Sequence, residues 1–164
     1  MFHSYNPATE LGPNAEAGFE VPYLEKKHII KAKDFIHAGQ GSVQLKRALK
    51  SVGFPADIIQ RVSICAYEAE MNVVMHGGNG VLTFRLDADE ILIDVEDDGP
   101  GIENIDLAFQ EGFTTASNEH LEMGFGAGMG LPNIKKNVDS LEIQSEKGKG
   151  THLKMRFQVK KDGD

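Results

Sequence analysis

The feature that most constrains the fold is a stretch of three- and four-residue apolar spacing between Pro55 and the glycine pair Gly77-Gly78. Proline suits the first turn of a helix, and the spacing predicts a helix with one apolar face. A helix of this kind has to be covered by another layer of structure, so the flanking segments must supply that layer. The apolar positions are Ile58, Val62, Cys65, Ala66, Ala69 and Val73.

Two pairs of strands are expected after this helix. In each segment β-forming residues lie between turn residues, and the second pair alternates apolar and polar residues. The turns are Asp87 to Glu90 and Gly148 to Gly150, which predicts two hairpins. The segments are Val81 to Leu86, Ile91 to Glu96, Leu141 to Ser145 and Thr151 to Val159.

Further elements complete the pattern. Lys27 to Phe35 is compatible with an edge strand, and a helix is expected from Ser42 until Gly53 ends it. Pro132 predicts the first turn of another helix. This order favours an α+β fold, a two-layer sandwich whose mixed, mostly antiparallel sheet carries helices on one face. The predicted apolar face of the helix after Ser42 contains Val43, Leu45, Leu49 and Val52.

Composition narrows the class of protein. The 164 residues fit one domain, which we place at residues 23–160 between a flexible leader, 1–22, and a disordered tail, 161–164. A net charge of −8 argues against nucleic-acid binding, which needs a basic surface. Neither a membrane-spanning run nor a signal-peptide pattern is present, so we expect a cytoplasmic protein that does not bind membranes. The single cysteine, Cys65, is expected to be a small buried hydrophobe.

Three polar residues recur every fourth position on the long predicted helix: Glu68, Asn72 and His76. This spacing places them on one stripe of the helix surface. Taken alone, the trio is most simply a solvated polar face. In a functional interpretation, Asn72 would supply a side-chain oxygen to Mg²⁺ and Glu68 would act as a general base, with His76 in a structural role.

The segment Asp97 to Gly101 also has two interpretations. Asp, Gly and Pro are common turn residues, so a tight turn is sufficient to explain it. Alternatively, the Asp97 carboxylate could accept a hydrogen bond from an amine such as that of adenine, with the glycines allowing close approach of the backbone. A calcium-binding EF-hand is excluded, because Ile105 stands where that loop requires a glutamate.

Four alternate glycines from Gly124 to Gly130 precede the helix that starts near Pro132. A flexible hinge would explain them. They could also present backbone N–H groups to phosphate at a helix N-terminus. Neither the Rossmann spacing nor the Gly-Lys-Ser/Thr end of a P-loop is present, so a phosphate-binding loop here would be of another kind.

Taken in order, these segments resemble the motifs of the GHKL ATPases, the superfamily of gyrase, MutL, a large heat-shock chaperone and the histidine kinases. Glu68 to Asn72 resembles the first motif, Asp97 to Gly101 the second, Gly126 to Leu131 the third and Gly148 to Thr151 the last. The resemblance implies the Bergerat ATP-binding fold and ATP with Mg²⁺ as cofactors.

Within that fold, the resemblance implies that Glu68 is the base and that Asn72 holds Mg²⁺. It also implies that Asp97 binds the adenine amine and that Thr151 supports this contact. The cofactor-binding residues implied in this way are Asn72, Asp97, Gly99, Gly101, Gly126, Gly128, Gly130, Leu131 and Thr151.

Among the GHKL proteins, the chain is most similar to bacterial anti-sigma factors and switch kinases, through Glu111 to Thr115 and Gly126 to Pro132. The resemblance implies a serine/threonine kinase that acts on a small regulatory partner, such as an anti-anti-sigma-like protein. The alternative is an anti-sigma-type module that sequesters a sigma factor with little catalysis. A slow stand-alone ATPase is favoured by no sequence feature, and a homodimer is compatible with the sequence.

One departure from the expected pattern concerns the supposed lid, Glu111 to Phe125, which contains no lysine or arginine. Phosphoryl transfer usually needs a cation near the γ-phosphate. That charge would have to come from Mg²⁺, from Lys135 or Lys136, or from a partner. Catalysis that depends on a partner is therefore one expectation.

Overall fold

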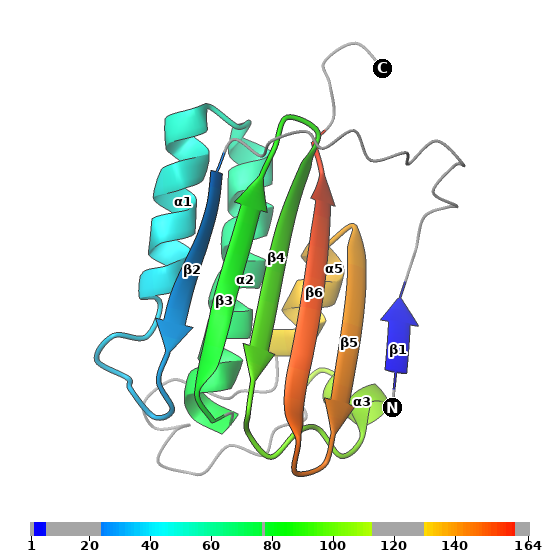
Figure 1. The fold of residues 1–164 in the computed structure, drawn as a ribbon. Coiled ribbons are helices and arrows are strands. Elements are labelled where there is room, and N and C mark those ends of the chain that lie inside the picture. Colours follow the sequence, from blue (N-terminus) through cyan, green and yellow to red (C-terminus); the bar gives the residue numbers. More distant parts are fainter. Residues whose placement is uncertain (1, 6–23, 77, 113–129, 160–164) are drawn as a thin grey trace.

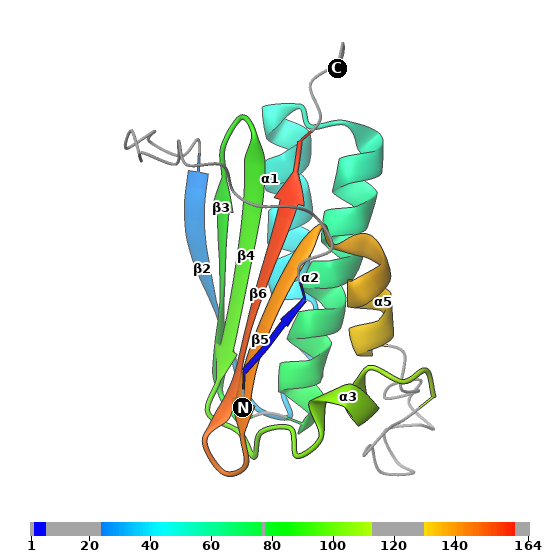
Figure 2. The same ribbon diagram turned by 90° about the vertical axis from the view of Figure 1, so that its right-hand side faces the viewer.

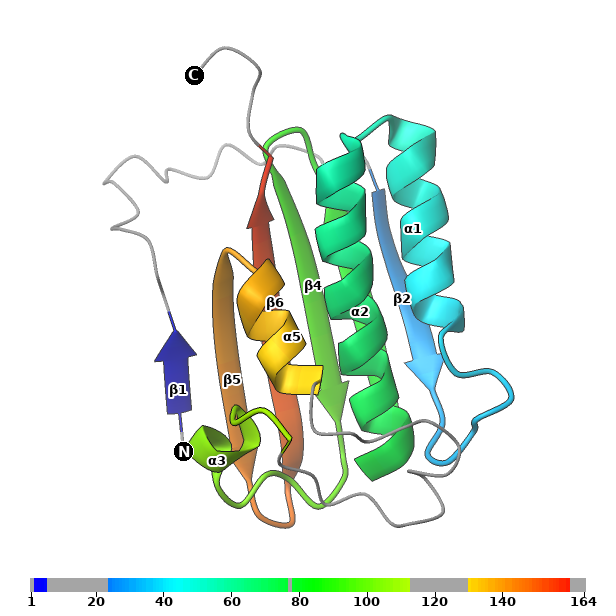
Figure 3. The same ribbon diagram turned by 180° about the vertical axis from the view of Figure 1, so that it is seen from behind.

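The fold is one sheet with helices on one of its faces, as a computed structural model shows for residues 2–5, 24–76, 78–112 and 130–159 (Figure 1). The six strands lie in the order β1-β5-β6-β4-β3-β2, and all the pairings described are antiparallel. The view from the side shows the two layers, and the view from behind shows the helices over the sheet (Figures 2 and 3). The predicted α+β sandwich is therefore confirmed.

The elements have the following bounds. The strands are β1 (Phe2–Tyr5), β2 (Leu24–Ile30), β3 (Gly80–Leu86), β4 (Glu90–Asp97), β5 (Ser140–Glu146) and β6 (Gly150–Gln158). The helices are α1 (Gln40–Val52), α2 (Ala56–His76), α3 (Ile105–Ala108) and α5 (Gly130–Asn137).

The core lies between the sheet and α2. Alternate residues of β4, namely Ile91, Ile93 and Val95, are buried toward the helices, because side chains alternate between the two faces of a strand. The apolar face predicted for α2 is confirmed, since all six of its members are buried. In the described part of the chain, no helix has the length and apolar character needed to cross a membrane.

Two predictions about α1 and the sheet edge need correction. Val43 and Val52 are exposed, at 48% and 42%, so they do not belong to the buried face of α1. Val43 precedes the buried Leu45 by two residues, which places it about 200° away around the helix. The edge strand β2 ends at Ile30, and Lys33 instead adopts a left-handed conformation, where its N–H donates to the Val74 carbonyl near the end of α2.

Strand β1 was not expected, because its segment has no strand periodicity. It pairs with β5, with Phe2 opposite Gln144 and Tyr5 opposite Leu141. The sheet therefore extends into the segment that we assigned to a leader. The rest of that segment, 6–23, lies outside the described residues.

Cys65 has the structural role expected of it. Its side chain is fully buried on α2, and its Sγ donates to the Ile134 carbonyl of α5 at 3.7 Å. Burial raises the pKa of the thiol to about 12. A thiol with so high a pKa is almost entirely protonated at neutral pH, so Cys65 acts as a packing residue.

A buried carboxylate connects α1 to α2. Glu70 is only 1% exposed, and its two oxygens accept the N–H groups of Gly41 and Ser42, at 3.0 and 2.9 Å. These N–H groups belong to the first turn of α1, where backbone donors lack partners within the helix. The negative charge also suits the positive end of the helix dipole. Glu70 therefore fixes the start of α1 against α2.

We predict that Glu70→Gln lowers the free energy of unfolding by about 1–3 kcal/mol, because an amide can satisfy only one of the two N–H groups. Urea unfolding followed by circular dichroism measures this change. Glu142→Gln, an exposed glutamate on β5, is the matched control and should change stability by about 0.5 kcal/mol or less. Equal effects of the two substitutions would contradict the capping role of Glu70.

Candidate functional site

The first half of the site lies where α2 meets the start of α5. Glu68 and Asn72 project from α2, and a Cβ placed on Gly130 would lie 3.1 Å from Asn72 Oδ1 and 3.4 Å from Glu68 Oε2. The distance to Asn72 is closer than ordinary side-chain contacts, and the distance to Glu68 is at their lower limit. The absence of a side chain at Gly130 thus allows the N-terminus of α5 to approach the two polar residues.

The position of α5 is fixed by its own core residues. Leu131, Pro132 and Ile134 are buried, so the helix is anchored beside α2. The N–H groups of a first helical turn lack partners within the helix and favour anions. The first turn of the helix, the part of a helix that favours anions, therefore lies directly beside Glu68 and Asn72.

Asn133 belongs to this group, and the sequence analysis did not select it. Its Nδ2 donates to Glu68 Oε1 at 3.2 Å. The bond fixes one oxygen of the carboxylate and leaves Oε2 on the side of Gly130. Asn133 directly follows the glycine-rich motif but is not one of its residues, so only the fold reveals its contact with a residue 65 positions away.

The second half of the site lies at the end of β4. Asp97 stands opposite Thr151 in the strand register, and its carboxylate accepts the Gly99 N–H at 2.9 Å. Burial raises the pKa of the Asp97 carboxyl above its usual value, against the effect of N–H groups of Gly99 and Thr151, while the charge of Asp98 adds to the rise. An ionised carboxylate here gains from each further hydrogen-bond donor.

Ser145 supports Thr151 from the neighbouring strand. The two hydroxyl oxygens are 2.8 Å apart, and Ser145 Oγ also accepts the Ile102 N–H at 2.7 Å and lies 3.1 Å from the Gly150 carbonyl. The serine is buried and pairs with Thr151 in the register. A short serine inside an alternating strand gave no signal in the sequence, although its network orients the Thr151 hydroxyl.

Glycines allow the loop after β4 to pack closely against the turn between β5 and β6. A Cβ on Gly150 would lie 1.9 Å from the Asp97 carbonyl oxygen, and one on Gly101 would lie 2.3 Å from the Glu146 carbonyl oxygen. The Gly148 N–H donates to the Pro100 carbonyl at 2.7 Å. Side chains at Gly101 and Gly150 would push the two segments apart.

A close contact joins the two halves. Gly80 stands opposite Asp97 in the register of β3 and β4, and a Cβ on Gly80 would lie 2.8 Å from Val73 Cγ1. Val73 is the neighbour of Asn72 on α2. The helix can therefore lie close to the strand that carries Asp97, and both halves occupy the same end of the molecule (Figure 3).

The predicted residues thus fall into two neighbouring groups. Glu68, Asn72, Gly130 and Leu131 lie at the junction of α2 and α5, whereas Asp97, Gly99, Gly101 and Thr151 lie at the strand ends. Gly126, Gly128 and the lid from residue 113 onward lie outside the described residues.

The two candidate cations of α5 have partners on the segment that follows α3. Lys136 Nζ is 2.5 Å from Glu111 Oε1, and Lys135 Nζ lies 5.9 Å from the centre of the Phe109 ring. Both contacts lie close to residue 112, where the described segment ends, and Glu111 is the first residue of the supposed lid. The lysines therefore connect the helix to the base of that segment.

Comparison with known proteins identifies the family. Residues 57–161 match the family described as histidine kinase-, DNA gyrase B-, and HSP90-like ATPase. This range contains both halves of the site, and the chain belongs to this family of ATPases. The predicted resemblance to GHKL proteins is confirmed.

Individual relatives point to the same branch. The chain is 37% identical to an anti-sigma F factor of Clostridium kluyveri over 105 residues, which is 61% of this chain and 70% of the relative. It is 37% identical over 112 residues to an anti-sigma F factor of Thermoanaerobacter sp., covering 65% and 72% of the two chains. It is 29% identical over 112 residues to the serine/threonine-protein kinase RsbT of Bacillus subtilis, covering 66% and 78%.

The approach of Gly150 to Asp97 can be tested with a matched pair of substitutions. Gly148 and Gly150 both have positive φ, of 81° and 94°, but a Cβ on Gly148 would meet nothing within 4 Å. We expect Gly148→Ala to cost about 1–2 kcal/mol of stability through backbone strain alone. Gly150→Ala should cost about 3 kcal/mol or more, because the new methyl group meets a backbone oxygen that cannot rotate away. Similar losses in urea unfolding would contradict the close contact.

Proposed function

We propose that this chain binds ATP with Mg²⁺ and transfers the γ-phosphoryl group to a serine or threonine hydroxyl of a small regulatory protein. Membership of an ATPase family implies the use of ATP. The observation that carries the rest is the position of Glu68 and Asn72 beside the N-terminus of α5. The relative named serine/threonine-protein kinase RsbT supports the choice of a kinase.

The residues present fit an ATP–Mg²⁺ complex. Asn72 Oδ1 offers a neutral oxygen of the kind that Mg²⁺ accepts together with phosphate oxygens. When bound, Mg²⁺ would neutralise part of the charge on the transferring group. Gly130 and Leu131 would present first-turn N–H groups to the phosphates, and Gly126 and Gly128 would extend this loop.

The adenine ring would bind at the other half of the site. Asp97 would accept a hydrogen bond from the exocyclic amine, while Gly99 and Gly101 would let the backbone approach the ring. Thr151 would support this contact, since Ser145 already orients its hydroxyl. The raised pKa of the Asp97 carboxyl fits such a role. Burial removes water that would hydrogen-bond to the ionised carboxylate, and the adenine amine would supply a donor in its place.

Glu68 would act as the base in the transfer. Asn133 holds one oxygen of its carboxylate, and the other lies on the side of Gly130. As the partner's hydroxyl oxygen bonds to the γ-phosphorus, its proton passes to Glu68. The bond between that phosphorus and the bridging oxygen breaks, and ADP leaves.

A second candidate function is sequestration of a partner with little phosphoryl transfer. The names of the relatives in Clostridium kluyveri and Thermoanaerobacter, both anti-sigma F factors, favour it. In this role, nucleotide would mainly order the surface that binds a sigma factor. The two functions differ in whether Glu68 is needed.

We predict that Glu68→Gln lowers transfer of labelled phosphate from ATP to the co-purified partner by about 10²–10⁴-fold. Binding of ATP, measured by titration calorimetry with Mg²⁺, should change by less than about threefold, since the amide retains the Asn133 contact. Glu142→Gln, on a strand face away from the helices, is the control and should change neither quantity. A partner that binds equally well to both proteins and is never labelled would favour sequestration instead.

Asp97→Asn should separate nucleotide affinity from stability. A raised carboxyl pKa stabilises the fold below the ordinary pKa of aspartate, and this stabilisation is lost as the pH rises through the raised value. The variant, which cannot ionise, should therefore be more stable at pH 7, and the difference should vanish in acid. Its affinity for ATP should fall by about 10–100-fold through loss of a charge-assisted hydrogen bond.

Urea unfolding between about pH 2.5 and pH 7, a range that begins below the ordinary aspartate pKa of about 3.9, and calorimetry with ATP measure the two effects. Thr151→Val is a companion variant that leaves the carboxylate in place and removes one supporting hydroxyl. Unchanged ATP affinity in Asp97→Asn would exclude the proposed adenine contact.

A further inference from the structure

The face of the sheet away from the helices carries a cluster of polar side chains near the ends of β4 and β6. Asp94 and Glu96 are two residues apart on β4, and His152 stands opposite Glu96 on β6. The residues between and beside them, Val95 and Leu153, are buried on the helix side. Strand alternation therefore directs all three polar side chains to the opposite face.

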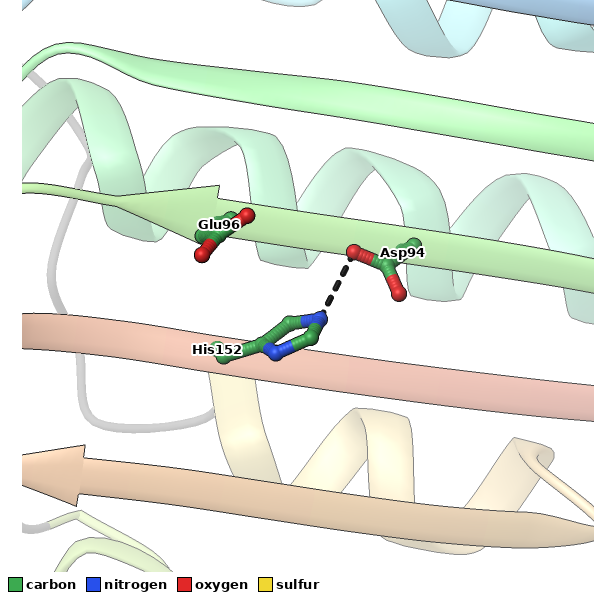
Figure 4. A group of neighbouring side chains, drawn as sticks. All are labelled: Asp94, Glu96 and His152. Atoms are coloured by element: carbon green, nitrogen blue, oxygen red, sulfur yellow. Dashed lines mark hydrogen bonds and ion pairs between the residues drawn. The ribbon is translucent and has the colours of Figure 1, made fainter.

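The three side chains converge. His152 Nε2 lies 2.8 Å from Asp94 Oδ1, and one ligand atom from each of the three residues lies within 4.8 Å of the others (Figure 4). The histidine bonds to the diagonal Asp94, although Lys154 is directly opposite Asp94 in the register. Within the described residues, this is the group of three His, Cys, Asp or Glu side chains close enough to share an ion.

The geometry points to a divalent transition-metal site: we propose that Asp94, Glu96 and His152 bind a metal ion of the zinc class. The imidazole nitrogen and the two carboxylate oxygens are all donors that bind Zn²⁺ in proteins. In a tetrahedral site with bonds near 2.0–2.1 Å, the ligand atoms are about 3.3 Å apart. The observed ligand atoms lie within 4.8 Å of one another, so side-chain rotation has to bring them closer by up to about 1.5 Å.

Metal binding would replace the hydrogen bond between His152 and Asp94. The ring proton moves to Nδ1, which leaves the Nε2 lone pair for the ion, and the Asp94 oxygen binds the same ion. Glu96 is exposed and can rotate to supply the third bond. No redox step or further reactant is required.

The surroundings leave room for a fourth ligand. Glu96 and His152 line a surface hollow together with Gln144, which stands opposite His152 on β5. The same hollow continues to Asp97, Ser145 and Thr151. A water molecule in this hollow would complete the coordination, as in open zinc sites. Lys149 also lines this hollow, and its Nζ forms an ion pair with Glu146 Oε1 at 3.0 Å.

This site uses none of the residues proposed to hold Mg²⁺, but the hollow beside it reaches the adenine half of the nucleotide site, at Asp97 and Thr151. Glu96 precedes Asp97 and His152 follows Thr151, but alternation places each pair on opposite faces of the sheet. An ion at the cluster would tie β4 to β6 behind the strand ends that carry Asp97 and Thr151. It should therefore stabilise the fold by linkage, without nucleotide present.

Titration of the full chain with Zn²⁺, in the absence of nucleotide and Mg²⁺, tests the site. Substitutions of residues that hydrogen-bond to a metal ligand usually weaken metal binding by about 10–100-fold. We expect Glu96→Gln and His152→Gln, which each remove a ligand, to weaken Zn²⁺ binding at least as much. Saturating Zn²⁺ should raise the unfolding temperature of the wild type and not that of the variants. Co²⁺ should give the visible absorption of a tetrahedral ion in the wild type alone.

The chain offers a matched control. His37 Nδ1 and Asp34 Oδ2 are 2.8 Å apart at an exposed position, but they form a pair and not a group of three. The double substitution Asp34→Asn/His37→Gln should leave Zn²⁺ binding unchanged. If His152→Gln fails to fold, the exposed Glu96 provides the decisive variant. Absence of Zn²⁺ binding, or equal binding by the wild type and Glu96→Gln, would overturn the proposal.

Discussion

The packing of α2 against the sheet is the constraint on which the rest of the structure depends. One face of this helix fills the core with residues such as Val62, Ala66 and Val73, and the sheet can lie close because these side chains are small or β-branched. The adjacent stripe carries Glu68 and Asn72. The free energy gained by burying the apolar face therefore also fixes the polar residues in space, since both belong to one rigid helix.

Glycines extend this arrangement from the helix to the strand ends. Gly80 lets α2 approach β3, Gly130 lets α5 approach Asn72, and Gly150 lets β6 approach the Asp97 carbonyl. At each place a methyl group would occupy space already taken by a polar atom or a core side chain. The site is thus formed where these elements approach more closely than side chains would allow. At the same places, backbone groups could contact the phosphates and the ring of a ligand.

Much of this could be predicted from the sequence, because the signals were local. Helical spacing identified the buried face of α2. β-forming residues between turns identified the strands of both hairpins, and alternation supported the second pair. The strand β1 gave no such signal, since its pairing with β5 joins residues far apart in the chain. Val43 was assigned to the wrong face of α1 because an apolar residue near a helix start was counted without its angle around the axis.

The residues that support the site escaped prediction for a related reason. Asn133, Ser145 and Glu70 act through partners that are distant in sequence or hidden in another element, and each is an ordinary residue in its own segment. Motifs reveal residues that contact a ligand, whereas supporting residues depend on the three-dimensional packing. The sequence therefore indicated what the site would bind more readily than what holds it together.

The most direct test of a single nucleotide site at the junction of α2, α5, β4 and β6 is a crystal structure with Mg²⁺ and a non-hydrolysable ATP analogue. We predict the adenine amine within hydrogen-bonding distance of Asp97, the metal about 2.0–2.1 Å from Asn72 Oδ1 and the phosphates at the start of α5. A nucleotide bound elsewhere, or one whose adenine ring makes no contact with Asp97, would contradict this arrangement.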